Sequence, residues 1–472
     1  MYFQSLDFIC FFTVVLTIYW LLPWRAQNLF LIPASLFFYG YYHAWFLLPF
    51  AATTLVDYFV ARGIESYPAR AKALVTLSVT SNLALLCAFK YFNFLSANVA
   101  SVLDLLHISV SPPVLDLVLP AGISFYTFQS IGYVVDVYRG HIPACRKFTD
   151  YALFVAFFPQ LVAGPIQRAA HLMRQIMEPR RLSPSAAGHA FLLLMWGMFK
   201  KVVIADNVAI TANKVFALRD PSFPLLWVGV LSFGVQIYAD FSGYTDIARG
   251  VARLMGFDLT RNFNHPYLAQ SPSDFWRRWH ISLSTWIRDY IFIPLGGSRG
   301  TGARTLLNLA IVFFLAGLWH GAAWNFIFWG LYYAALTFVY RIAAAIVPEG
   351  LQVTPLAKPF RILFMFALTH VGWLIFREHN TAQLLRDFTL SPAAADAMQW
   401  QIAAYLGALT LLYASPLLLH VIWDVGVRPH WRTARPEHWA AWSSRAFVAT
   451  ALFCLILLLR SGSVQDFIYF QF

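Results

Sequence analysis

The sequence predicts an all-α protein that crosses a membrane many times, and three observations support this. Of its 472 residues, 59% are hydrophobic and only 12% are charged, whereas soluble proteins carry roughly 25% charged residues. The apolar residues form runs that reach the roughly 20 residues of a spanning helix. The 34 Lys and Arg residues lie in short clusters between these runs, as in the cytoplasmic loops of multi-pass proteins. The net charge of +12 therefore does not indicate a nucleic-acid partner.

The first apolar runs give the expected orientation. Residues 6–23 predict a retained span, because no basic segment precedes them as in a cleavable signal. Arg25 follows directly, so the positive-inside rule predicts an N-terminus outside the cytoplasm and a cytoplasmic Arg25. Residues 28–60 are too long for one helix and predict an out-and-back pair broken around Gly40. Another span is expected at 73–95.

Helix breakers mark the next segments. Residues 99–118, interrupted by Pro112 and Pro113, predict a helix lying near the membrane surface. Residues 121–138 carry hydroxyls and an amide, which predicts a helix that faces protein rather than lipid. Residues 150–167 contain Pro and Gly within an apolar run and predict a kinked or re-entrant helix buried in protein.

The second half of the chain supplies the remaining spans. An apolar run at 187–199 is closed by Lys200 and Lys201, and a span at 224–239 ends in YADFSGYTD. Three further spans are expected at 359–376, 400–423 and 444–459. We therefore predict ten to twelve spans plus re-entrant and interfacial helices. They form one membrane domain over residues 1–472, with the motifs concentrated at 120–345.

His320 is the first candidate for chemistry. It lies in a stretch from Thr305 to Tyr340 that contains no Asp, Glu, Lys or Arg. An imidazole in such surroundings is costly, so it is kept neutral and lines a polar cavity or has a partner, which makes it a functional candidate. The alternative is a structural histidine that hydrogen-bonds a neighbouring helix. Gly317 and Gly321 would allow another backbone or a thin substrate to approach closely.

His280 is the second candidate, in a segment that has two different faces if it forms one helix. The cationic stripe consists of Arg277, His280, Ser284 and Arg288. The aromatic stripe on the opposite face consists of Trp279, Leu283, Trp286 and Tyr290. One interpretation is an interfacial helix whose arginines contact lipid phosphates. The other is that the cationic stripe binds an anionic ligand such as a cofactor phosphate.

The acidic residues and the remaining motifs add less. Asp240 and Asp246 are six residues apart, so they do not share a helix face and are expected to pair with nearby arginines. The sequence contains no G-x-S-x-G, Walker or zinc-ligand spacing. A hydrolase elbow, a nucleotide-driven pump and a metal centre are therefore not expected.

Six stretches together resemble the membrane-bound O-acyltransferase (MBOAT) family, and within it the bacterial branch concerned with alginate O-acetylation. They are PAGISFYTFQSIGYVVDVYRG (120–140), FFPQLVAGP (157–165), YADFSGYTD (238–246), FWRRWHISLSTWIRDYIFIPLGGSRG (275–300), GLWHG (317–321) and the terminal FIYFQF. The resemblance spans most of the chain in order. Its most specific part is the combination of WRRWHISLSTWIRDY with GLWHG.

The resemblance implies a fold, a reaction and partners. It implies a helical bundle around a central tunnel or funnel in the bacterial inner membrane, with His320 as the signature histidine and His280 as the second active-site position. An acetyl group would pass from a cytoplasmic donor, acetyl-CoA, across the membrane to an exported polysaccharide such as alginate. A periplasmic acetyltransferase partner and membrane lipids are expected, and no permanently bound cofactor. Peptidoglycan O-acetylation and D-alanyl transfer to teichoic acid are the alternatives.

Chemistry supports roles for the two histidines. Acyl transfer from a thioester to a hydroxyl needs a base, and His is suited to that near neutral pH. Burial keeps His320 in the basic form, so we expect it to be the general base. His280 would orient the donor or stabilise the oxyanion with help from Asn325 or a backbone N–H. The further donor-binding or substrate-binding candidates are Arg277, Arg278, Ser284, Arg288, Asp240 and Tyr238.

Other readings predict different features. An acyl-enzyme through Ser282 or Ser284 would need an adjacent base, and none is evident from the spacing. A lipid-linked glycan transporter that catalyses nothing would show paired broken helices in corresponding halves, which the sequence lacks. A scaffold of a secretion complex is a further alternative, and thioester turnover would count against it.

Overall fold

The computed structural model describes residues 1–346, 357–427, 439–462 and 465–470, and every regular element within these ranges is a helix. The chain divides into two compact units, Met1–Ala187 with Val251–Thr260, and Gly188–Gly250 with Arg261–Phe472. Among the described residues, eight helices are long and apolar enough to cross a membrane, and Leu6–Leu21 and Ser443–Leu459 are shorter apolar helices. The predicted all-α membrane fold is confirmed. The range of ten to twelve spans and the single-domain organisation stay predictions.

The helices of the first unit follow the predicted runs closely. They are α1 (Leu6–Leu21), α2 (Trp24–Gly40), α3 (Leu47–Ser66), α4 (Ala71–Leu86), α5 (Phe92–Leu105), α6 (Ile123–Tyr138), α7 (Phe148–Ala156), α8 (Phe158–Leu161) and α9 (Ala169–Met177). The break predicted around Gly40 is confirmed, because α2 ends at Gly40 and α3 begins at Leu47. Of these two helices α3 is long and apolar enough to cross a membrane and α2 is not, so the out-and-back crossing stays a prediction.

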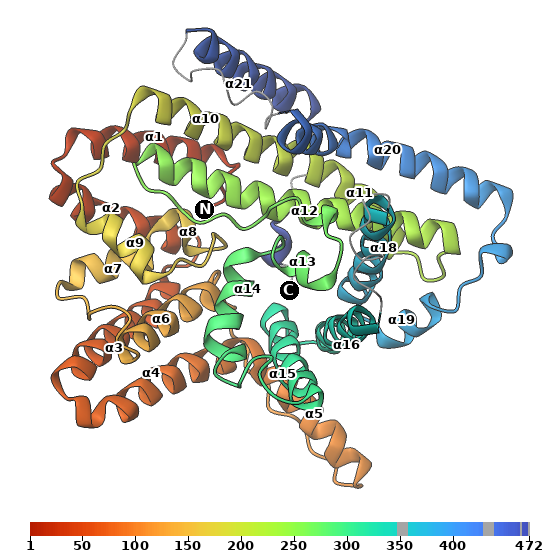
Figure 1. The fold of residues 1–472 in the computed structure, drawn as a ribbon, viewed down its shortest axis with the longest axis horizontal. Helices are drawn as coiled ribbons and strands as arrows, with labels where there is room; N and C mark the ends of the chain where they lie inside the picture. Colours follow the sequence, from red (N-terminus) through yellow and green to blue (C-terminus); the bar gives the residue numbers. More distant parts are fainter. Residues whose placement is uncertain (347–356, 428–438, 463–464, 471–472) are drawn as a thin grey trace. The chain divides into compact units, whose positions relative to one another are not determined.

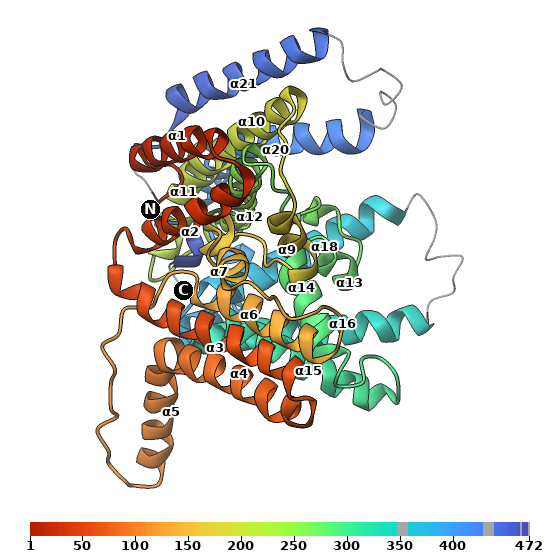
Figure 2. The ribbon, with the colours of Figure 1, turned by 90° about the vertical axis from the view of Figure 1, so that its left-hand side faces the viewer.

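A buried carboxylate on α3 joins this helix to α4. Helices α3, α4 and α6 lie side by side (Figure 2). Asp57 of α3 accepts hydrogen bonds from Ser78 Oγ at 2.5 Å and Asn82 Nδ2 at 2.9 Å on α4. A buried polar group without such partners would be costly. Helix α6 is buried along most of its length, so the prediction that residues 121–138 face protein is confirmed.

The helix predicted for 99–118 is wrong beyond Leu105, where α5 ends. A π-helical turn joins α4 to α5, so this apolar helix is longer than predicted. Residues 108–119 then form no regular structure and are exposed. Pro112 and Pro113 explain this, because proline lacks the amide hydrogen that helix propagation requires.

The broken segment predicted at 150–167 is confirmed as kinked and buried. The chain turns at Phe157 (φ −50°, ψ 105°) between α7 and α8, one residue before a helix that contains Pro159. Two glutamine side chains stabilise the break: Gln129 and Gln160 both donate to the carbonyl oxygen of Phe154, at 2.6 and 2.7 Å. Buried amides thus occupy the backbone acceptor near the kink.

The helices of the second unit include the long spans of the C-terminal half. They are α10 (Pro184–Phe199), α11 (Asp206–Phe216), α12 (Phe223–Leu254), α13 (Pro272–Trp276), α14 (Ile281–Ile287), α15 (Gly302–His320), α16 (Trp324–Ile346), α18 (Ala357–Arg377), α19 (Thr381–Asp387), α20 (Ala397–Val421) and α21 (Trp439–Leu459). Helix α12 continues to Leu254, so the motif YADFSGYTD lies inside this helix rather than at its end.

Two glycines set the distance between α15 and α16, which form an adjacent pair (Figure 1). A side chain at Gly317 would collide with the carbonyl group of Phe326, and one at Gly330 with that of Phe313. A side chain at Gly321 would collide with the ring of Phe326. The predicted close approach at Gly317 and Gly321 is therefore confirmed, and the partner is the neighbouring helix of the same chain.

Lys200 and Lys201 do not close a helix, contrary to the prediction. A π-helical turn, Lys200–Ala205, carries the chain from α10 into α11, and both lysines are buried in ion pairs. Lys200 Nζ lies 2.6 Å from Asp246 Oδ2. Lys201 Nζ lies 2.9 Å from Asp206 Oδ1 and 3.1 Å from Asp240 Oδ1. Buried charges need such partners. The apolar residues on either side of the two lysines in the sequence do not indicate which carboxylates these partners are.

The same charge cluster holds the C-terminal segment. Lys201 Nζ donates to the carbonyl oxygen of Gln465 at 3.0 Å, and Asp240 Oδ2 accepts from the amide of Ile468 at 2.8 Å. The terminal motif FIYFQF is described up to residue 470, and its last two residues lie outside the described ranges. These contacts place Tyr469 next to the two candidate histidines.

Candidate active site

The segment predicted as one continuous helix across His280 consists of two short helices. Helix α13 ends at Trp276 and α14 begins at Ile281, and between them His280 has a left-handed backbone with φ 42°. This conformation is strained for a residue with a side chain and is common at functional sites. It is fixed on one side by the amide of Ile281, which donates to the carbonyl oxygen of Asn262 at 2.9 Å. The ring of His280 therefore leaves the predicted cationic stripe.

His280 is sealed among aromatic rings. The residue is 1% exposed. The centroid of its ring lies 4.7 Å from that of Phe241, 5.6 Å from that of Trp319 and 6.3 Å from that of Tyr469. Burial penalises the imidazolium form and lowers the pKa of His280 to about 3. Its ring is therefore neutral at physiological pH.

His320 lies at the end of α15 and is 4% exposed. Its ring centroid lies 4.9 Å from that of Trp329, 5.3 Å from Phe376 and 5.6 Å from Tyr469. Tyr469 and Trp319, whose ring lies 5.0 Å from His320, contact both histidines. In contrast to His280, His320 lines a cavity.

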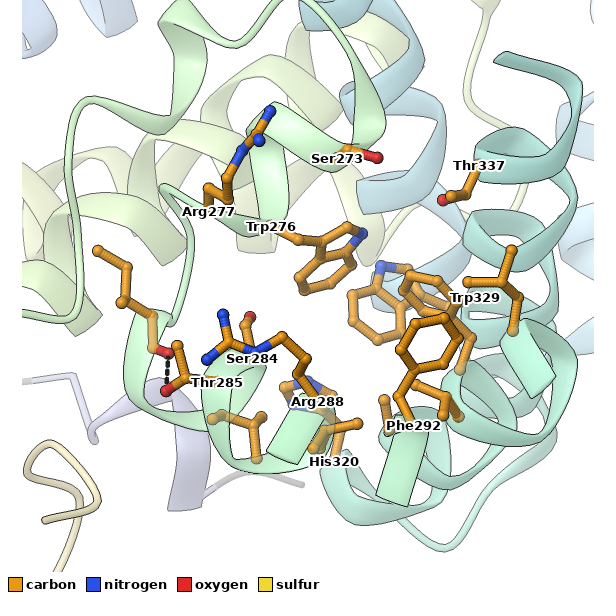
Figure 3. A pocket seen from close by; sticks show the side chains of 17 residues that line it. Ser273, Trp276, Arg277, Ser284, Thr285, Arg288, Phe292, His320, Trp329 and Thr337 are labelled. Atoms are coloured by element: carbon orange, nitrogen blue, oxygen red, sulfur yellow. Dashed lines mark hydrogen bonds between the residues drawn. The ribbon is translucent and has the colours of Figure 1, made fainter. Parts of the chain in front are cut away.

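This cavity has a volume of about 320 Å³ and lies within the second unit (Figure 3). Its walls are mostly apolar and come from α14, α15 and α16, with Val312, Phe313 and Trp329 among them. The exposed residues Arg277 and Arg288 also line it, whereas His320 is buried. Charged side chains thus mark the solvent-accessible part and the imidazole lies further inside. A volume of this size accommodates a small organic ligand.

Four of the predicted site residues come together in this cavity: Arg277, Ser284, Arg288 and His320. Figure 3 shows Ser284 of α14 beside Arg288, the first residue of the π-helical turn that follows α14, with Trp276 across the open space. Arg288 Nε also lies 2.8 Å from Asp289 Oδ1.

The other predicted residues lie outside the cavity lining. Arg278 Nε pairs with Asp274 Oδ1 at 2.9 Å. Asn325 Nδ2 donates to the carbonyl oxygen of Phe376 at 2.7 Å and so ties α16 to α18. Tyr238 packs against aromatic neighbours, with Tyr267 at 5.5 Å. Asp240 binds Lys201 and the C-terminal segment, whereas the arginine partner predicted for Asp246 is present as Arg249 at 3.2 Å.

Sequence reasoning missed the aromatic residues that enclose the histidines, chiefly Trp319, Trp329, Phe376 and Tyr469. Trp319 lies inside the GLWHG motif and Tyr469 inside the terminal motif, so a signal was present for these two. Trp329 and Phe376 belong to apolar helices whose aromatic residues are numerous, and the pattern does not distinguish them from ordinary core residues.

Comparison with known proteins identifies the family. The profile of the membrane-bound O-acyltransferase family (MBOAT) matches residues 145–374. A probable alginate O-acetylase of Azotobacter vinelandii is 41% identical over 86% of this chain and 84% of its own length. One from Pseudomonas putida is 37% identical over 98% of both chains, and a peptidoglycan O-acetyltransferase of Helicobacter pylori is 32% identical over 96% and 94%. The chain therefore belongs to the membrane-bound O-acyltransferase family and is an O-acyltransferase of the alginate O-acetylase type.

Proposed function

We propose that the protein takes an acetyl group from acetyl-CoA and passes it on for O-acetylation of an exported polysaccharide, with His320 as the general base. One observation carries this proposal: His320 is buried yet lines a cavity whose exposed side carries Arg277 and Arg288. An anionic thioester donor matches the cations, and the imidazole lies where the reacting carbonyl would be shielded from water.

The proposed reaction is a direct acyl transfer. One ring nitrogen of His320 removes the proton of the acceptor hydroxyl, and the oxygen attacks the thioester carbonyl. The tetrahedral intermediate then collapses, the carbon–sulfur bond breaks, and the thiolate takes the proton back from the imidazolium. The ester and a free thiol are the products. Neutral imidazole is the form that accepts a proton, so a buried site suits the base.

His280 is a positioning residue in this proposal. It does not line the cavity, but its ring and that of His320 share the neighbours Trp319 and Tyr469. Its left-handed backbone also sets where α14 begins, and α14 supplies Ser284 to the cavity. We infer that His280 fixes the wall on which the donor is bound. Asn325 acts similarly from α16 through its bond to the backbone of α18.

Arg277 and Arg288 are proposed to hold the phosphates of the donor. Arginine binds phosphate through several charge-assisted hydrogen bonds in a planar fork. Both side chains are exposed and line the cavity, so a bound nucleotide could remain at the surface while its thioester arm enters. The apolar walls offer little hydrogen bonding to a free polysaccharide, which favours the thioester arm as the occupant of this space.

The acceptor is proposed from the relatives. The names of the proteins from A. vinelandii and P. putida specify alginate, and these matches cover most of both chains. The relative from H. pylori is named for peptidoglycan, at 32% identity, so peptidoglycan is the second candidate acceptor. A periplasmic acetyltransferase partner and a location in the bacterial inner membrane, with the N-terminus in the periplasm, are parts of the same proposal.

The test uses purified protein in proteoliposomes with acetyl-CoA labelled in the acetyl group. We expect label on an acceptor polysaccharide with the wild type, and a loss of about 10²- to 10⁴-fold in His320→Ala, as for removal of a general base. The matched control is His141→Ala, because His141 is exposed and lies in the first unit. Near wild-type transfer by His320→Ala would contradict the proposal. A transporter would transfer no label to any acceptor.

A further inference from the structure

The first unit contains a second cavity, of about 880 Å³, that plays no part in the proposed reaction. Its lining comes from the start of α2, from the loop 142–147 before α7, and from α9. Four basic residues contribute to it: Arg25, Arg146, Lys147 and Arg174. Asp150 and Glu178 are the acidic residues of the lining, which leaves an excess of two positive charges.

The four cations are available to a ligand. All four residues are exposed, and within the ranges that the structure describes none of them forms an ion pair. Arg25 lies over the ring of Trp24, at 5.3 Å from its centroid. The lining contains two more cations than carboxylates, so the cations are not fully neutralised, and an anion between them would relieve their mutual repulsion.

The backbone around the basic loop is fixed. Tyr58 Oη donates to the carbonyl oxygen of Arg146 at 2.7 Å, and the amide of Cys145 donates to Tyr133 Oη at 2.9 Å. The amide of Ala144 donates to Glu65 Oε1 at 2.6 Å. These three partners belong to α3 and α6, so packed helices hold the loop in place. Little ordering of the loop would therefore be needed when a ligand binds.

The cavity lies near the ends of two apolar helices, α1 and α3. Arg25 follows the last residue of α1, Leu21, by four positions, and Glu65 binds the amide of Ala144 in the loop from the last turn of α3, which ends at Ser66. If α2 crosses between them, the ends of α1 and α3 lie on the same side. The clustered cations predict that this side is cytoplasmic, and a tryptophan such as Trp24 is typical of the membrane–water boundary.

We propose that this cavity binds the phosphate headgroup of an anionic phospholipid from the cytoplasmic leaflet. Arg146, Lys147 and Arg174 would surround the phosphate. The apolar part of the lining, including Met173 and Met177, would contact the glycerol and the first methylenes of the acyl chains. A soluble phosphate would use only the cations, so the mixed lining favours a lipid. Basic pockets at the cytoplasmic ends of spanning helices are suited to such headgroups.

The test measures phosphatidylglycerol retained by the purified full-length protein, by native mass spectrometry during titration from detergent, with phosphatidylethanolamine as the zwitterionic comparison. The cavity variant is Arg146→Gln/Lys147→Gln. Its matched control is Arg70→Gln/Lys72→Gln, which removes the same charges from exposed positions where α4 begins. We expect the cavity variant to bind phosphatidylglycerol at least about tenfold more weakly, on the scale of about fivefold per basic residue. The control should match the wild type.

Two outcomes would overturn the proposal. The first is equal loss of phosphatidylglycerol from the cavity variant and the control, which would reduce the effect to net charge. The second is displacement of the lipid from the wild type by excess inorganic phosphate, which would indicate a soluble anion instead. Thermal unfolding of both variants in phosphatidylethanolamine should equal that of the wild type, because the four replaced side chains are exposed.

Discussion

The two histidines of the active-site motifs occupy opposite kinds of environment although both are almost completely buried. His320 ends a long helix and lines a cavity with two exposed arginines, whereas His280 lies in a strained turn, enclosed by aromatic rings. Fractional exposure does not separate them, at 4% and 1%. The lining of the cavity does. Of the two, only His320 lines the cavity that we propose for the donor.

The comparison teaches that one motif pair can contain a reacting group and a positioning group. Trp319 and Tyr469 contact both rings, so we expect a substitution at His280 to act on His320 through these shared neighbours. We therefore expect substitutions at the two positions to differ in kind as well as in size. The following predictions test this difference.

The largest difference is expected from the same substitution at the two positions. His320→Gln should lower kcat by about 10²- to 10⁴-fold, because the base is lost, with little change in the thermal unfolding midpoint. His280→Gln should shift the midpoint more and lower kcat less, because it acts through packing. Steady-state kinetics and thermal unfolding of both variants measure this. The reverse pattern, with His280 essential for turnover and His320 only for folding, would contradict the assignment.

The next effect concerns the charge cluster that places Tyr469 between the two rings. Lys201→Met should destabilise the protein by about 3–5 kcal/mol, because it leaves the carboxylates of Asp206 and Asp240 buried without their cation. Turnover should fall as well, since Lys201 and Asp240 hold the C-terminal segment. The matched control is Lys214→Met on α11, where the lysine is exposed. Equal unfolding midpoints for the two variants would show that the cluster is not needed.

The sealed position of His280 predicts a pH dependence of stability. Its pKa of about 3 in the folded protein lies below the ordinary value of 6.5, so below pH 6.5 the unfolded chain binds a proton that the folded one does not. Stability should therefore fall as the pH decreases from 6.5 toward 3, by about 1.4 kcal/mol per pH unit for this residue. The unfolding midpoint of the wild type minus that of His280→Gln isolates this contribution. A difference that is constant between pH 7 and pH 4 would mean that the ring is hydrated in the folded state.

The sequence predicted the fold class, the break at Gly40, the kink near Phe157 and the pairing of Gly317 with a close neighbour, because each depends on local chemistry. It did not predict that Lys200 and Lys201 are buried, because their carboxylate partners come from α11 and α12 and pairing depends on the fold.

The prediction of the cationic stripe is confirmed only in part, again because local spacing does not determine the fold. The prediction placed Arg277, Ser284 and Arg288 on one face of a single helix, and these three residues do line one cavity. His280 leaves the stripe because its backbone turns to φ 42°, a conformation that helical spacing does not anticipate in a non-glycine residue. The aromatic enclosure of the histidines was missed because its members come from three separate helices and the C-terminal segment.

The smallest expected effect tests the exposed side of the cavity. Arg288→Gln should raise KM for acetyl-CoA by about five- to tenfold and leave kcat nearly unchanged, because an exposed cation contributes to binding through screened contacts with the donor phosphates. Two comparisons sharpen the result. S-acetylpantetheine, which lacks the nucleotide phosphates, should show the same KM with variant and wild type. Arg299 is an exposed arginine outside the cavity lining, so Arg299→Gln should change KM for neither substrate. If KM for S-acetylpantetheine rose as much as KM for acetyl-CoA, Arg288 would act by shaping the cavity rather than by binding phosphate. Arg288 would then be a positioning residue, as we propose for His280.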